Sequence, residues 1–171
     1  NGFLYTFGDS SVNVISNVQT SGTPATTTFN NANVDPQMGT PWRDSIQAFG
    51  RALLYANPSG IYALYGGSAE KISGELDGLF AKANFSTGVT PTSAVMTIFG
   101  VKCYMLSLTT LNPFDADAEK PLLCMWNEQK WFLGSQDDDL KLVALQTINS
   151  DLNAFGSDNT TVYPLFELPS L

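Results

Sequence analysis

The sequence contains no histidine and only two cysteines among its 171 residues. Without an imidazole there is no Ser-His-Asp triad, no histidine metal ligand and no general base of the kind that titrates near neutral pH. Two cysteines without histidine cannot supply the four ligands of an ordinary structural zinc site. The commonest routes to hydrolase and metalloenzyme activity are therefore excluded, and we expect no catalytic, metal-binding or cofactor-binding residues.

Charged residues are scarce and mostly acidic. They make up 14% of the chain, compared with about 25% in typical soluble domains. Sixteen Asp and Glu outnumber eight Lys and Arg, for a net charge of −8. The cations are scattered singly, which argues against binding to phosphate backbones. A surface this poor in charge suggests that part of it is covered by a partner or by more of the same polypeptide.

No stretch is apolar for long enough to span a bilayer, and no basic segment followed by an apolar run indicates a signal peptide. We expect no membrane association. The sequence starts without an initiator Met, and its first residues already read as a strand. We therefore expect residues 1–171 to form a single all-β segment that belongs to a longer chain.

Apolar runs joined by tight polar turns recur over residues 46–65, 94–110 and 122–145. The first run contains two predicted strands, 52–56 and 61–65, on either side of an Asn-Pro-Ser-Gly turn, in which Pro fixes φ and Gly accepts a positive φ. The last contains strands 122–126 and 130–134 around an Asn-Glu-Gln turn. Two strands separated by a short polar turn are typical of β-hairpins.

Two segments depart from this pattern. Residues 16–40 are rich in Thr, Asn, Gly, Ser and Pro and have no sustained apolar period, so they are predicted to be a long polar loop, suited to an inter-subunit contact. Between residues 70 and 83, Ile72, Leu76 and Leu79 fall near helical spacing. This spacing predicts one short helix or turn there, although two glycines weaken it.

Cys103 and Cys124 each lie in an apolar strand, and we interpret both as small buried hydrophobic residues. A disulfide between neighbouring strands is the alternative. Acidic clusters at residues 115–119 and 137–139 are interpreted as solvated turns, because neither has the full set of ligands that a calcium-binding loop needs.

Aromatic side chains stack on sugar rings, and several fall in or beside the predicted hairpins: Trp42, Tyr62, Tyr65, Tyr104, Trp126, Trp131 and Phe132. Trp126 and Trp131 flank a tight turn and alternate with aliphatic residues. Packing inside the core is therefore favoured over a sugar-binding surface.

Segments that begin near residues 42, 94 and 140 recur at close to the period of β-propeller blades, which is about 40–50 residues. A chain of this length holds about three or four blades, too few for a comfortable closed ring. The predicted fold is all-β, with antiparallel β-propeller-like blades that form a partial propeller.

Four features resemble the propeller part of a tail-hub protein of short-tailed phages, from the packaged-DNA stabilisation or head-completion group. They are residues 39–44 (Gly-Thr-Pro-Trp-Arg-Asp), the following Phe-Gly at 49–50, residues 102–108 and the tryptophan hairpin at 126–132. The resemblance implies a structural virion component of a phage tail or neck that acts through subunit contacts around the DNA channel. Its implied partners are copies of itself and other virion proteins, such as portal, adaptor or tail proteins, and no enzymatic residues carry over.

A second hypothesis is a carbohydrate- or receptor-binding β module at a phage tail tip or a cell surface. The aromatic content and the Thr- and Asn-rich residues 16–40 motivate it. An enzyme that uses a pair of carboxylates is a distant third, because spacing alone does not identify such a pair. None of these hypotheses requires sequence-specific nucleic-acid binding.

Overall fold

The computed structural model describes residues 3–35, 38–83, 85, 90–98, 100–111, 119–135, 144–148, 151–155 and 162–164. The strands are β1 (Leu4–Phe7), β2 (Val12–Ser21), β3 (Thr26–Asp35), β4 (Gln47–Phe49), β5 (Ala52–Asn57), β6 (Gly60–Tyr65), β7 (Ser68–Lys71), β8 (Thr92–Ile98), β9 (Val101–Leu111), β10 (Glu119–Trp126), β11 (Trp131–Ser135), β12 (Ala144–Ile148), β13 (Asp151–Phe155) and β14 (Val162–Pro164). Within these ranges the prediction of an all-β chain is confirmed.

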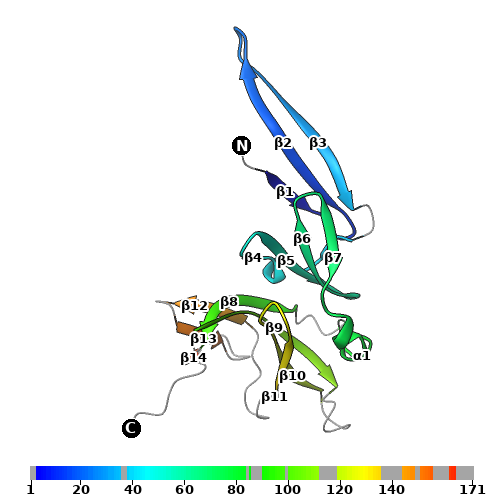
Figure 1. The fold of residues 1–171 in the computed structure, drawn as a ribbon, viewed down its shortest axis with the longest axis vertical. Helices are drawn as coiled ribbons and strands as arrows, with labels where there is room; N and C mark the ends of the chain where they lie inside the picture. The colour runs from blue at the N-terminus through cyan, green and yellow to red at the C-terminus, as the bar shows by residue number, and fades with distance from the viewer. Residues whose placement is uncertain are drawn as a thin grey trace.

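The described strands form four antiparallel sheets in which neighbours follow one another in the chain. Their orders are β1-β2-β3, β4-β5-β6-β7, β11-β10-β9-β8 and β12-β13-β14. Each sheet keeps two edge strands among the described residues, so none of them closes into a barrel. Figure 1 shows the β1–β3 sheet at one end of the molecule, the β4–β7 sheet next to it, and the other two sheets beyond.

The predicted hairpins are confirmed where the structure describes them. β5 and β6 meet at the Asn57↔Gly60 pair, and Gly60 has a φ of 142°. β10 and β11 meet at Trp126↔Trp131, where the Asn127 side chain accepts the backbone N–H of Lys130. The third pair, β8 and β9, turns at Gly100, whose φ is 80°. Of the segment predicted to begin near residue 140, residues 136–143 lie outside the described part, whereas its strands β12, β13 and β14 are described and form a sheet of their own.

Central strands are buried on both faces, which explains their continuous apolar runs. Along β5, Ala52, Leu54 and Ala56 belong to one core cluster, whereas Tyr55 belongs to another on the opposite face. β10 alternates in the same way between Cys124 and its neighbour Leu123. Because successive side chains of a strand point to opposite faces, a strand with two buried faces has no polar alternation.

The sheets pack on one another in chain order. The main core lies between the β4–β7 and β8–β11 sheets and includes Phe49 and Trp126, whose ring centroids are 5.5 Å apart. A second cluster, around Tyr55 and Val12, joins the β4–β7 sheet to the base of the β1–β3 sheet. β12, which belongs to the fourth sheet, lies against β8. These are layers of sheet on sheet.

The prediction of a polar loop over residues 16–40 is wrong for most of its length. Residues 16–21 continue β2, and residues 26–35 form β3, which pairs with it as a long hairpin. The hairpin has no apolar period because both of its faces are exposed to solvent over most of this length. Its Thr content is nevertheless compatible with strands, because β-branched side chains favour extended backbone.

The predicted short helix near residues 70–83 is confirmed. A 3₁₀ turn, η2 (Gly74–Leu76), leads directly into the helix α1 (Asp77–Phe80). The helix buries Phe80 in the main core, and Asp77 is held by an ion pair with Lys71 at 2.6 Å. A further 3₁₀ turn, η1 (Arg43–Ser45), precedes β4. No helix in the described part of the chain is long and apolar enough to cross a membrane.

Candidate interaction site

A two-stranded ribbon projects from the molecule at the β1–β3 sheet (Figure 1). β1 pairs with β2 only as far as Leu4↔Ile15, whereas β2 and β3 remain paired out to Ser21↔Thr26. We call residues 16–30, which lie beyond the end of β1, the arm. Ten-residue strands rise by about 3.3 Å per residue, so the hairpin spans about 33 Å.

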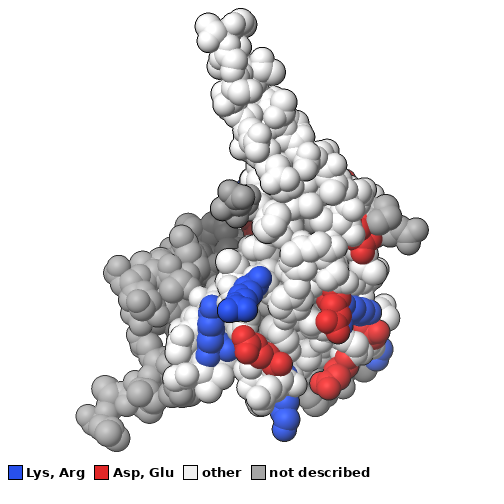
Figure 2. Space-filling model, turned by 45° about the horizontal axis from the view of Figure 1, so that its top comes forward, with Lys and Arg blue, Asp and Glu red and all other residues white. Residues whose placement is uncertain are grey.

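The arm carries no charge. The sequence from Ser10 to Val34 contains no Lys, Arg, Asp or Glu, and Asp9 and Asp35 flank this stretch. Figure 2 shows the projecting ribbon without a charged side chain, while Lys, Arg, Asp and Glu gather on the rest of the molecule. Across the ribbon, the hydroxyls of Thr20 and Thr27 lie 3.0 Å apart in a hydrogen bond.

A β-bulge places two apolar side chains in this polar ribbon. The register shifts between Ser16 and Gln19, so that two residues of β2, Asn17 and Val18, oppose the single residue Phe29 of β3. Asn17 has a φ of 50°, a conformation that Asn tolerates better than most residues. Val18 is 61% exposed and Phe29 55% exposed. A bulge re-aims side chains locally, so this position differs from the regular Thr and Asn ladder around it.

The base of the arm is fixed to the rest of the molecule by backbone contacts. Gly39 packs directly on the turn at residues 8–11, and the backbone N–H of Thr40 donates to the carbonyl oxygen of Gly8 at 2.9 Å. From the β4–β7 sheet, Asn57 donates through its side-chain amide to the carbonyl of Gly39 at 3.0 Å. The arm is therefore presented from a well-anchored support.

Two tyrosines, Tyr55 and Tyr62, also contribute to the contact between the base of the arm and the β4–β7 sheet. The Tyr55 hydroxyl donates to the carbonyl of Met38 at 3.0 Å, and the Tyr55 ring meets Phe7 edge-on at 5.2 Å and stacks on Tyr62 at 5.6 Å. Burial raises the pKa of Tyr55 to about 12, with smaller contributions from the negative charge of Asp35 and from Tyr62. A buried phenol with a donor bond stays protonated, which suits a structural role.

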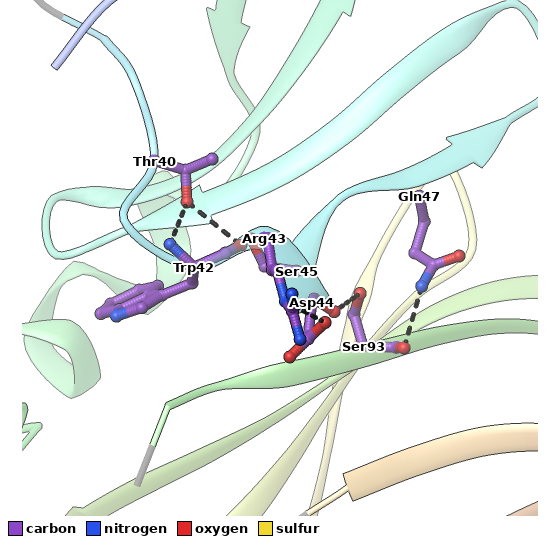
Figure 3. A network of polar contacts seen from close by, with 7 residues as sticks. All are labelled: Thr40, Trp42, Arg43, Asp44, Ser45, Gln47 and Ser93. Atoms are coloured by element: carbon purple, nitrogen blue, oxygen red, sulfur yellow. Dashed lines mark hydrogen bonds and ion pairs between the residues drawn. The ribbon is translucent and has the colours of Figure 1, made fainter. Parts of the chain in front are cut away.

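Residues 40–45, which overlap the run 39–44 that suggested the phage resemblance, form a polar connection through the buried hydroxyls of Thr40 and Ser45 (Figure 3). The Thr40 hydroxyl accepts the backbone N–H of Trp42 at 3.0 Å and donates to the carbonyl of Ala56. Ser45 accepts the N–H of Ala56 at 3.0 Å and donates to the carbonyl of Trp42 at 2.7 Å. These two hydroxyls satisfy backbone groups of Trp42 and Ala56 that have no neighbouring strand to bond with at this position.

The same segment connects two sheets. Ser93 of β8 donates to the carbonyl of Asp44 at 2.9 Å, and the Gln47 amide donates to the carbonyl of Ser93 at 3.0 Å (Figure 3). The buried Tyr104 hydroxyl donates to the carbonyl of Ser45 at 2.9 Å, and burial raises its pKa. The exposed Arg43 guanidinium pairs with Asp44 at 3.4 Å, a contact that contributes little to stability.

Most of the aromatic residues that the sequence singled out lie in cores. Trp42, Tyr62, Tyr104 and Trp126 are buried, which confirms the interpretation as core for these four. Trp131 is half-buried, and its indole N–H donates to the carbonyl of Ile72 at 2.9 Å. The remaining two are exposed: Tyr65 at 48% and Phe132 at 49%.

The cysteines behave as predicted. Both Cys103 and Cys124 are buried free thiols, and burial raises the pKa of the Cys124 thiol to about 12. Burial also raises the pKa of Cys103. The acidic clusters at 115–119 and 137–139 lie outside the described residues, apart from the backbone of Glu119. The described side chains contain no group of three or more His, Cys, Asp or Glu that could hold a metal ion.

Sequence reasoning missed three parts of this site: the arm, the close contact at Gly39 and the two bridging hydroxyls of Thr40 and Ser45. One signal for the arm was present, namely a long uncharged stretch with three consecutive threonines. No family model, curated protein or solved structure matches the chain.

Proposed function

We propose that this chain is a structural virion component of a phage tail or neck, either a tail hub or a head-completion protein, that acts through subunit contacts around the DNA channel. The observation that carries the proposal is the projecting, uncharged arm on an anchored base. An extended ribbon buries little of its own surface. We infer that the conformational entropy lost in ordering the arm is offset by contacts with another chain that covers it.

The arrangement of the sheets supports a partial propeller as the finer description of the fold. β4–β7 and β8–β11 are consecutive four-stranded antiparallel sheets in which each strand pairs with the next in the chain. They pack through the core that contains Phe49 and Trp126, and a three-stranded antiparallel sheet, β12–β14, follows them. Successive four-stranded meanders that pack in chain order are typical of propeller blades.

The charge distribution agrees with a channel component. A net charge of −8 disfavours adhesion of DNA, so DNA would pass a surface of this kind without being held. The resemblance to the tail-hub group carries no enzymatic residues, and this proposal accordingly assigns no catalytic role. The partners are copies of the chain and other virion proteins, such as portal, adaptor or tail proteins, and the location is the virion.

A carbohydrate- or receptor-binding module is less well supported. Sugar recognition by stacking needs aromatic faces that are open to solvent. Of the exposed aromatic residues in the described part of the chain, Phe3 precedes β1, and Phe29, Tyr65 and Phe132 belong to three different sheets. The tryptophans are buried or half-buried. The structural role is therefore the better supported of the two.

Immunogold electron microscopy tests the proposed function. Antibodies raised against the chain should label the neck or tail of purified particles of the phage that encodes it. Complete particles that package DNA but carry none of this chain, as shown by mass spectrometry of their proteins, would contradict the proposal. A glycan array probed with the same protein is the matched test of the alternative, and we expect no specific binding.

A further inference from the structure

We propose that the arm pairs with the arm of a second copy of this chain, through the outer edge of β3, antiparallel and about a two-fold axis at Phe29. This inference rests on the proposed function, which already requires contacts between copies. It adds the strand, the register and the symmetry of one such contact.

The outer edge of β3 is open. β2 is the central strand of its sheet, so β3 has one partner among the described strands. From Thr26 to Asn33 its backbone pairs on one side alone. The outer edge of β2 is less suitable, because β1 covers it up to Ile15 and the bulge at Asn17 and Val18 then interrupts its regular spacing.

β3 lacks the features that protect open edges in monomeric proteins. Such proteins place charged side chains, prolines or bulges on an edge, or keep the edge strand short. β3 has ten residues, contains no proline and carries no charge before Asp35 at its base. Its only bulged residue, Val34, also lies at the base, where the register shifts between Val12 and Asn13. An edge of this kind is a template for pairing with another strand.

A second copy is the occupant that the charges favour. Two copies with a net charge of −8 repel each other over most of their surfaces, and the neutral stretch from Ser10 to Val34 removes this repulsion at the arm. An antiparallel pair also places the two bodies at opposite ends of the paired arms, because each arm projects away from its own body (Figure 1). The interface is then isologous, with the same residues on both sides.

Phe29 sets the register. It is 55% exposed, and its neighbours in β3 from Thr26 to Asn33 are Thr, Asn and Ala. A two-fold axis at Phe29 brings the two Phe29 side chains opposite each other and pairs Thr28 with the partner's Asn30. Every facing pair along the arm is then neutral, and aromatic cross-strand pairs are among the stabilising ones.

Cysteine cross-linking of the full chain tests this arrangement. Directly opposed residues in antiparallel strands have Cα atoms about 4.5–5.5 Å apart, within the disulfide range of roughly 4.4–6.8 Å. F29C should therefore form a disulfide-linked dimer under mild oxidation. V18C is the matched control, because Val18 is at least as exposed as Phe29 but lies on β2, and it should stay uncross-linked. The native Cys103 and Cys124 are buried and should contribute little background.

A charge substitution gives the second readout. F29K opposes two like charges and removes the apolar contact, so the dissociation constant of the dimer should rise at least about tenfold, whereas V18K should leave it unchanged. Equal cross-linking of V18C and F29C, or a dimer insensitive to F29K, would overturn the inference. So would a cross-link that appears only when V18C and F29C are mixed, which indicates head-to-tail pairing. In each of these cases antibody labelling of phage particles still tests the proposed function independently.

Discussion

Gly39 lies directly against Gly8. Gly8 precedes β2 and Gly39 follows β3, so this contact closes the base of the hairpin that forms the arm. A Cβ atom on Gly39 would overlap the carbonyl oxygen of Gly8 and the backbone nitrogens of Ser10 and Ser11. Gly39→Ala should therefore destabilise the protein by about 1–3 kcal/mol, the usual cost of overpacking. Chemical denaturation measures this loss, and hydrogen exchange at residues 8–12 should show faster opening of the base of the arm.

Gly74→Ala is the control for this substitution. A Cβ at Gly74 would meet open space, and the position begins a 3₁₀ turn. The free energy of unfolding of this variant should lie within about 0.5 kcal/mol of that of the native protein. A Gly39→Ala protein as stable as the Gly74→Ala protein would show that the arm is not anchored through this contact.

Removal of one buried hydroxyl should weaken the connection between residues 40–45 and β5. Ser45→Ala leaves the N–H of Ala56 without its side-chain acceptor in a buried position. A buried donor without a partner costs about 1–3 kcal/mol, which urea denaturation can measure. Ser68→Ala removes an exposed hydroxyl that bonds the carbonyl of Tyr65 at 3.4 Å, and it should be nearly neutral. Equal effects of the two changes would contradict a structural role for Ser45.

Stability should fall at alkaline pH in a way that depends on Tyr55. The pKa of Tyr55 is raised from 10.0 to about 12 in the folded protein, so the unfolded chain loses this proton first. The contribution of the buried phenol is therefore complete below about pH 10 and is lost as the pH rises toward 12. Denaturation at several pH values should show a shallower decline above pH 10 for Tyr55→Phe.

The same variant should lose about 1 kcal/mol at pH 7, because the Met38 carbonyl no longer receives a hydrogen bond. Cys124 and Tyr104 also have raised pKa values and will add to the alkaline decline in both proteins. The comparison between the two proteins isolates Tyr55. If the native protein and Tyr55→Phe lose stability with the same pH dependence, the fold does not raise the pKa of Tyr55.

The two cysteines should be unreactive in the folded state. Thiolates are the reactive species, and burial raises the pKa of both thiols while it blocks access. A thiol reagent at pH 8 should modify both residues in urea and neither at an appreciable rate in native buffer. Rapid labelling of Cys124 in native buffer would contradict its placement in the core between the two central sheets.

The hairpins were predictable because their strands are apolar and their turns carry recognisable residues. The Asn57-Pro58-Ser59-Gly60 turn and the run at 122–126 predict strand pairs whatever lies on either side of them. The arm was not predictable in this way. Its pairing is local, but both faces meet solvent, so the alternation of apolar and polar residues that usually indicates a strand is missing.

The polar connection was missed for a different reason. Trp42 and Ser45 are buried in a short segment outside the sheets, and the bonds that permit this come from Ala56 and Tyr104, which are distant in sequence. Close contacts of this kind depend on how sheets stack, which a hydrophobic pattern does not specify. The same limit applies to Gly39, because nothing in its local sequence indicates the backbone of Gly8 as its neighbour.

Sedimentation velocity of the chain with and without its arm tests the central claim most directly. In the shortened variant, an Asn-Gly turn replaces residues 17–29, so that β2 and β3 still pair from Val12↔Asp35 to Ser16↔Asn30. We predict that the native chain sediments as a dimer and that the shortened variant, which keeps a cooperative thermal unfolding transition, sediments as one copy. The same assembly in both proteins, or a native chain that stays a single copy at high concentration, would contradict the account.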